Sequence, residues 1–275
     1  MSIKNMKAIN FVICLFPILL FSQIPDITGT AIDTSSYSFV RSKIRMETLF
    51  IETEPSNPKN YYNRAKLYTE IRDYDAALKD YNKVDSLFPN DLATHYYRGA
   101  VYDRLGNYEQ AIFNFSAVIE INPEFEGGYS DRGMIYFRMK NYKKAETDFK
   151  KALELKPNWT IPLVNLGKVY FEQNKYSEAI TYYKKAIESD PGNYLAYQNL
   201  GFAYFTQKEY DLAIESYTEA ITLFPKYYNA IRSRADAKSA KGDTSGACED
   251  IRLAASLGDT KAIDHLKNND ICKDK

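Results

Sequence analysis

The sequence contains few of the residues that enzymes use for chemistry. Only two histidines, His95 and His265, and three cysteines occur among 275 residues. No HExxH, GxSxG, Walker-type or CxxC motif is present. Because these motifs bring a nucleophile, a base or metal ligands together, their absence argues against catalysis. We therefore expect a protein that is not an enzyme, with no metal site and no cofactor.

The chain also lacks net charge, because 36 basic residues balance 36 acidic ones. Nucleic acids and anionic membrane surfaces select proteins with an excess of lysine and arginine. Neither is an expected partner here. The composition, 45% hydrophobic and 26% charged, is that of a folded globular protein.

Long hydrophobic runs are missing except near the start. Lys4 and Lys7 precede an apolar run over residues 11–21, which is short for a membrane span. This order is typical of a secretory signal peptide. We expect residues 1–22 to form one that is cleaved after Ser22, leaving an exported protein without a membrane span; an uncleaved anchor is the alternative.

Tyrosine and phenylalanine are abundant, with 24 and 15 copies, and many of them recur at a fixed spacing. Five strings with tyrosine second and alanine fifth repeat every 34 residues, at 73–77, 107–111, 141–145, 175–179 and 209–213. The same period is kept by Pro89, Pro123, Pro157, Pro191 and Pro225. Such a period indicates stacked repeats, which we place at residues 58–91, 92–125, 126–159, 160–193 and 194–227.

Each unit has the pattern of two helices. In the unit that begins at residue 126, small Gly133 is followed by Tyr136, and Ala145 is followed by Phe149. Residues three or four apart share one helical face. Small side chains on one helix then accommodate large ones on the other, and the proline ends the second helix. His95 stands where other units carry tyrosine or leucine, so we expect it to pack in the core.

This order of small residue, aromatic, alanine, aromatic and proline resembles the tetratricopeptide repeat (TPR) family. The resemblance implies an all-α fold, a right-handed superhelical α-solenoid of antiparallel helix hairpins. Residues 228–275 depart from the pattern and are interpreted as a degenerate sixth repeat with a C-terminal cap, similar to Sel1-like repeats. Residues 23–57 are interpreted as a leader and a capping helix over 38–54. The apolar residues expected to cover the end of the stack are Phe39, Val40, Ile44, Met46, Leu49 and Phe50.

The resemblance further implies that the first helix of each unit lines a concave groove. Ten residues of these helices are candidates for peptide binding: Tyr62, Tyr96, Tyr97, Asp131, Phe137, Asn165, Phe171, Asn199, Phe202 and Phe205. Aromatic anchors beside polar groups suit a bound peptide, although such an aromatic can equally pack on a neighbouring helix. The Lys, Asn, Asn, Lys, Arg clamp with which some family members hold an acidic chain end is not reproduced.

Cys248 and Cys272 are expected to form a disulfide. A helix from Cys248 to residue 257 rises about 14 Å, and a following helix would return the chain by a similar distance. In an oxidising compartment the bond would add roughly 3 kcal/mol of stability. Two free thiols are the alternative.

Together these observations predict an exported TPR scaffold or adaptor that binds a protein or peptide segment in its groove. Its expected location is the periplasm, the cell envelope or the exterior. One alternative is a structural envelope protein that associates with itself. Another is an accessory subunit that uses its aromatic residues to bind glycans or cell-wall material.

Overall fold

The structure, a computed structural model, describes residues 34–268 and Cys272. The expected signal peptide and residues 23–33 of the leader lie outside this part of the chain. The described residues form helices and no strand. The helices are α1 (Thr34–Thr53), α2 (Pro58–Glu70), α3 (Tyr74–Leu87), α4 (Leu92–Arg104), α5 (Tyr108–Ile121), α6 (Glu126–Arg138), α7 (Tyr142–Leu155), α8 (Thr160–Glu172), α9 (Tyr176–Ser189), α10 (Tyr194–Thr206), α11 (Tyr210–Leu223), α12 (Tyr228–Lys241), α13 (Thr244–Ser256) and α14 (Thr260–Asn268).

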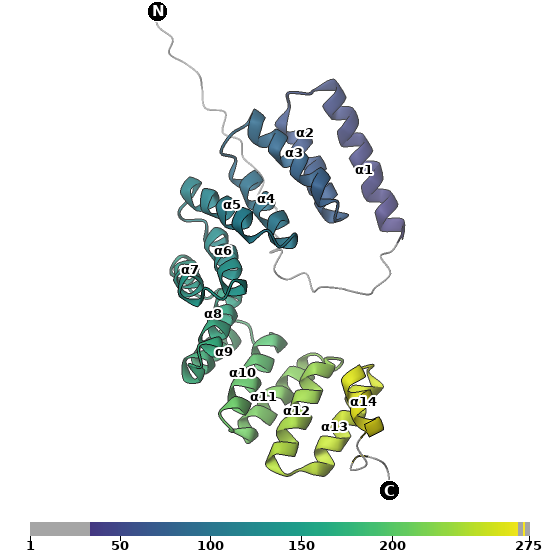
Figure 1. Cartoon of the computed structure of the whole chain (residues 1–275), viewed down its shortest axis with the longest axis vertical. Coiled ribbons are helices and arrows are strands. Elements are labelled where there is room, and N and C mark those ends of the chain that lie inside the picture. Colours follow the sequence, from purple (N-terminus) through teal and green to yellow (C-terminus); the bar gives the residue numbers. More distant parts are fainter. Residues whose placement is uncertain (1–33, 269–271, 273–275) are drawn as a thin grey trace, which may run out of the picture.

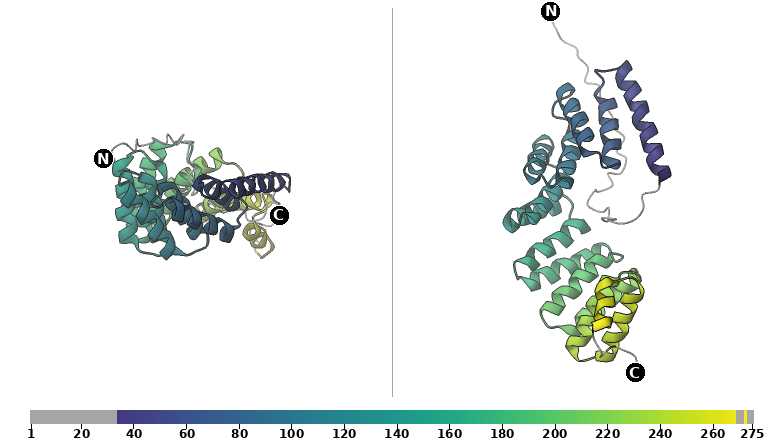
Figure 2. Two further views of the ribbon diagram at one scale, coloured as in Figure 1. Left: turned by 90° about the horizontal axis from the view of Figure 1, so that it is seen from above. Right: turned by 45° about the vertical axis from the view of Figure 1, so that its right-hand side comes forward.

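The helices form a curved stack of antiparallel pairs (Figure 1). From α2 to α13 consecutive helices pair, and the second helix of each pair packs against the first helix of the next. Each of the five 34-residue units contains one such pair. In Figure 1 the middle pairs lie to the left and both ends of the stack lie to the right, and Figure 2 places α1 and α14 at opposite ends. The predicted all-α solenoid is confirmed.

The repeated strings mark the turn inside each hairpin. Their first residue caps the second helix: Asp73, Asn107 and Asn141 each accept a hydrogen bond from a backbone NH three residues later. The residue before the string has a positive φ in each of the five units. In the second unit this residue is Gly106, which adopts that conformation without strain.

The small residue of each first helix allows a close approach to the second. A Cβ placed on Gly167 would lie 2.5 Å from a ring carbon of Tyr183, and one on Gly201 would lie 2.7 Å from Tyr217. Both rings are nearly fully buried. The expected interlocking of small and large residues is therefore present, and it fixes the two helices of a hairpin in register.

A buried ion pair also recurs, although it was not predicted from the sequence. Arg132 of α6 makes two hydrogen bonds to Asp148 of α7, at 2.8 and 2.9 Å, and a third to Ser116 of α5 at 3.0 Å. The arginine thus joins its own hairpin to the preceding one. The same geometry occurs around two further pairs, Arg64 with Asp80 and Arg234 with Asp250.

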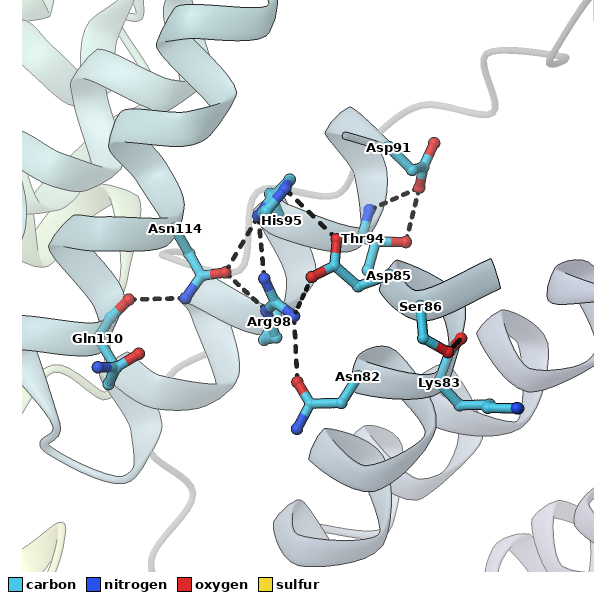
Figure 3. A network of polar contacts seen from close by, with 10 residues as sticks. All are labelled: Asn82, Lys83, Asp85, Ser86, Asp91, Thr94, His95, Arg98, Gln110 and Asn114. Atoms are coloured by element: carbon cyan, nitrogen blue, oxygen red, sulfur yellow. Dashed lines mark hydrogen bonds and ion pairs between the residues drawn. The ribbon is translucent and has the colours of Figure 1, made fainter. Parts of the chain in front are cut away.

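In the second unit a different polar network, around His95 and Arg98, takes the place of this ion pair (Figure 3). Asn114 replaces the aspartate and accepts from Arg98 at 2.7 Å, while Asp85 of α3 supplies the negative charge at 3.1 Å. His95 Nδ1 lies 3.1 Å from the Arg98 guanidinium, and the residue is 5% exposed. His95 is a buried structural residue, as predicted.

The capping helix α1 differs from the expectation. It begins at Thr34 rather than near residue 38. Val40 is buried, and Thr48 accepts a hydrogen bond from Arg64 of α2. Four of the six residues expected to cover the stack are instead about half exposed: Phe39, Met46, Leu49 and Phe50. The helix presents only one face to α2, so apolar side chains on its other faces remain in contact with solvent.

The C-terminal end consists of the pair α12 and α13 followed by α14. The disulfide expected between Cys248 and Cys272 is present, with the two Cα atoms 5.2 Å apart. Arg252 of α13 donates a hydrogen bond to the carbonyl oxygen of Cys272 at 2.8 Å. These two contacts tie Cys272 to α13.

Candidate functional site

The first helices of the hairpins form the inner wall of the stack. Successive first helices contact each other, as in the pairs α6 with α8, α8 with α10 and α10 with α12. Among the described residues, the second helices of successive hairpins contact each other less than the first helices do. Elements on the inside of a curve lie closer together than those on the outside. The ten residues predicted to line a groove all lie on first helices, from α2 to α10, and their individual environments differ.

The aromatic residues at the N-terminal end of this wall form one cluster. Tyr62 and Tyr97 meet edge to face, with ring centroids 5.9 Å apart, and the Lys66 ammonium lies 5.2 Å from the Tyr97 ring. Tyr62 and Tyr97 keep part of their surface exposed. Tyr97 and Lys66 border a cleft of about 910 Å³ that is lined by residues of α1, α2, α3 and α4. This cleft was not predicted, because it depends on where α1 packs.

Tyr96 requires a correction. It is only 2% exposed, and its ring packs against Phe115 and Phe125. Its hydroxyl donates a hydrogen bond of 2.6 Å to Asp131 of the next unit. Tyr96 is therefore a core residue that joins two hairpins, and it presents almost no surface to a ligand. Its neighbour Tyr97 takes the exposed position because consecutive helical residues point in different directions.

A second aromatic cluster lies on α8 and α10. Phe171 and Phe202 come from different units, and their ring centroids are 5.1 Å apart. Phe202 is 48% exposed. Phe137 and Phe205 each pack on a tyrosine of their own hairpin, Tyr142 and Tyr210. Phe171 packs in the same way on Tyr176, with ring centroids 5.2 Å apart, but it also contacts the exposed Phe202 of the next unit. This contact between units makes Phe171 and Phe202 the better candidates for anchoring a ligand.

Polar side chains run beside this aromatic pair. Asn165 lies on α8 and Asn199 at the corresponding position of α10. Asn165 is 5% exposed, yet neither asparagine side chain makes a hydrogen bond within residues 34–268. Buried polar groups normally have a partner. The two amides are thus available to bond with water or with a ligand.

Asp131, the third polar candidate, is held differently. It accepts the Tyr96 hydrogen bond and is partly buried. Burial raises the pKa of its carboxyl group from 3.8 to about 6, and the Tyr96 hydroxyl and Arg138 offset part of this rise. Asp131 therefore serves mainly to link two repeat units and is not a free contact for a ligand.

The raised pKa of Asp131 predicts a pH dependence of stability. The folded state binds this proton more tightly than the unfolded chain, so the stabilisation is complete below about pH 4 and is lost as the pH rises through about 6. Asp131→Asn is expected to raise the free energy of unfolding at pH 7 by about 1–2 kcal/mol. Urea unfolding at pH 4.5 and pH 7 measures both effects. An equal pH dependence in the wild type and the variant would contradict this assignment.

Other classes of site are not seen in the described residues. Among residues 34–268 and Cys272, no group of histidine, cysteine, aspartate and glutamate is arranged to hold a metal ion. None of the helices in that part of the chain is long and apolar enough to cross a membrane.

Comparisons with known proteins agree with this architecture. Models of the tetratricopeptide repeat match residues 58–91, 93–125, 128–158 and 194–227, and a TPR repeat model matches residues 167–208. None of these repeat-model matches extends beyond residue 227, so the likeness of the last unit to Sel1-like repeats stays a prediction. A search of curated protein sequences found no match.

Solved structures share the fold. A tetratricopeptide repeat protein from Parabacteroides merdae is 23% identical, with a TM-score of 0.65 over 84% of this chain and 91% of its own. The C-terminal part of a TPR protein from Cytophaga hutchinsonii is 20% identical, with a TM-score of 0.66 over 85% and 98%. YrrB, described as a TPR protein with an unusual peptide-binding site, is 18% identical, with a TM-score of 0.55 over 69% and 98%. The repeat models and the helix pairs together show that this chain belongs to the tetratricopeptide repeat family.

Proposed function

We propose that the protein is a non-catalytic scaffold that binds an extended segment of another protein along the inner wall of α8 and α10. One observation carries the proposal: Phe171 and Phe202 form an aromatic pair at the surface, beside Asn165 and Asn199, whose amides have no partner in the described chain. The aromatic pair supplies apolar contact area, and amides can bond to the backbone of an extended peptide. YrrB, whose fold is similar, is described as having a peptide-binding site.

The proposal is tested with a library of short synthetic peptides selected on the purified protein. Affinities of the enriched peptides are then measured for Phe171→Ala and Phe202→Ala variants. Each truncation is expected to weaken binding by about 2 kcal/mol, roughly thirtyfold, because it removes an anchor from the centre of the contact.

Phe113→Ala provides the matched control. Phe113 is 61% exposed, but it lies on α5, a second helix away from the inner wall. This variant should keep wild-type affinity. Unchanged affinity in the Phe171 and Phe202 variants, or an equal loss in the Phe113 variant, would refute the proposed groove.

We also propose that the protein acts after export, in the periplasm, in the cell envelope or outside the cell. Two observations support this location: the basic and then apolar start of the sequence, and the Cys248–Cys272 disulfide. Structural disulfides persist in oxidising compartments and are rare in the cytosol.

Self-association is a second candidate function, favoured by the apolar surface of α1. Phe39, Met46, Leu49 and Phe50 are about half exposed along this terminal helix. Light scattering over a range of concentrations tests this candidate, and a monomer at every concentration would exclude it.

A further inference from the structure

Lys168 lies in the middle of the proposed groove. It is on α8, one turn after Asn165 and one turn before Phe171. Residues three apart share one face of a helix, so Lys168 has Asn165 on one side and Phe171 on the other. Phe171 contacts Phe202 of α10. Lys168 was not among the predicted site residues, because a lysine on a helix is ordinarily a solvated surface residue.

The ammonium group of Lys168 has no partner within the described chain. It makes no hydrogen bond or ion pair among residues 34–268, and burial alone lowers the pKa of the group. Lys238, which is also largely buried, forms an ion pair with Asp250 at 2.9 Å. A cation that is removed from water without a partner reduces stability. Lys168 therefore has the environment of a cation whose counter-ion comes from outside the chain.

The neighbouring amides complete a set of hydrogen-bond donors. Asn165 precedes Lys168 on α8, and Asn199 precedes Phe202 by one turn on α10. Amide NH₂ groups and an ammonium group all donate hydrogen bonds. A carboxylate carries a single charge and accepts several such bonds. The charge of one lysine can balance the charge of one carboxylate, and the lysine and the two amides can donate hydrogen bonds to its oxygens.

We propose that Lys168, Asn165 and Asn199 form a subsite for a carboxylate of the bound segment, beside the aromatic pair of Phe171 and Phe202. The inference rests on the proposed peptide-binding function and specifies its partner: a segment with an acidic residue next to an apolar one. The acidic group is an aspartate or glutamate side chain within the segment.

The probes are peptides enriched from the synthetic library, which is made with both free and amidated C-termini. One enriched peptide is synthesised with its glutamate and with glutamine in its place. The glutamate peptide is expected to bind the wild-type protein about tenfold more tightly, because it gains a charge-assisted hydrogen bond. Amidation of the C-terminus should leave this preference unchanged. A preference that follows the free C-terminus instead would overturn the assignment to a side chain.

Lys168→Met is the decisive variant. It should bind both peptides with similar affinity, so the tenfold ratio falls to about one. Lys168→Gln should give the same result and serves if the methionine variant is poorly soluble. Lys79→Met, which changes an exposed lysine on α3, should keep the tenfold ratio. A preference for glutamate that survives in both Lys168 variants would contradict the subsite.

Two further measurements distinguish a role of Lys168 in ligand binding from a purely structural role. Since the charge of Lys168 is unpaired in the folded chain, Lys168→Met should melt at the same temperature as the wild type or higher, and a large decrease would indicate a structural role. The NMR-measured pKa of Lys168 should rise when the glutamate peptide binds, but not when the glutamine peptide binds. If peptides bind through Phe171 and Phe202 without any preference for glutamate, the subsite fails while the proposed function stands.

Discussion

Asp148→Ala is expected to lower the free energy of unfolding by about 3 kcal/mol. The substitution removes the acceptor of two hydrogen bonds from Arg132 and leaves a largely buried guanidinium without a counter-ion. Arg132 also bonds to Ser116 of the preceding hairpin, so the loss weakens the contact between two repeats. In a stack held together by neighbour contacts, such a loss reduces the stability of the whole array. Urea unfolding followed by circular dichroism measures the change.

Two controls distinguish a buried pair from a surface one. Asp211→Ala removes a carboxylate that pairs with Lys241 but is 78% exposed, and it should leave the unfolding midpoint unchanged. The double variant Arg132→Leu with Asp148→Ser copies the fifth unit, which carries Leu200 and Ser216 at these places. It should recover most of the lost stability, because no buried charge remains. A double variant as unstable as Asp148→Ala would contradict this explanation.

Replacement of both Cys248 and Cys272 by serine is expected to destabilise the C-terminal end by roughly 3 kcal/mol. The disulfide closes a loop between residues 24 apart in the sequence, and its removal gives the unfolded chain more conformational freedom. Since each repeat contacts only its neighbours, the loss should be largest in α12, α13 and α14. Hydrogen exchange measured helix by helix detects this gradient.

Reduction provides the control for the disulfide. A reducing agent should destabilise the wild type to the level of the double serine variant and should leave that variant unchanged. The thiol content of the denatured, unreduced protein is the complementary measurement. Reactive Cys248 and Cys272 thiols in the protein isolated from cells would refute the bond and would remove one support for export.

The repeat itself could be predicted because its signals are local. The cap at Asn141, the tyrosine that follows it and the pairing of Gly133 with Phe149 all lie within one hairpin. The ion pair of Arg132 with Asp148 was also readable, since the same residue types recur 16 positions apart in three units. It was not predicted, because aromatic and small residues alone were taken to define the repeat.

Other features depend on packing between units and could not be read from one helix. Tyr96 and Tyr97 are adjacent tyrosines, and only the position of α5 and of Phe125 decides which of them is buried. The environment of Lys168 likewise depends on how the neighbouring helices enclose α8. The exposed face of α1 was unexpected because the sequence shows that the helix is apolar, but not how much of it α2 can cover.

The claim that the inner wall binds a peptide is tested most directly by photo-crosslinking. A photoreactive phenylalanine analogue is placed at Phe202 on the inner wall or at Phe113 on α5, and each protein is mixed with a labelled peptide from the library selection. We predict that the analogue at position 202 captures the peptide and that unlabelled peptide competes with this capture. The analogue at position 113 should capture none. Equal capture from both positions, or capture from position 113 alone, would contradict binding in the groove.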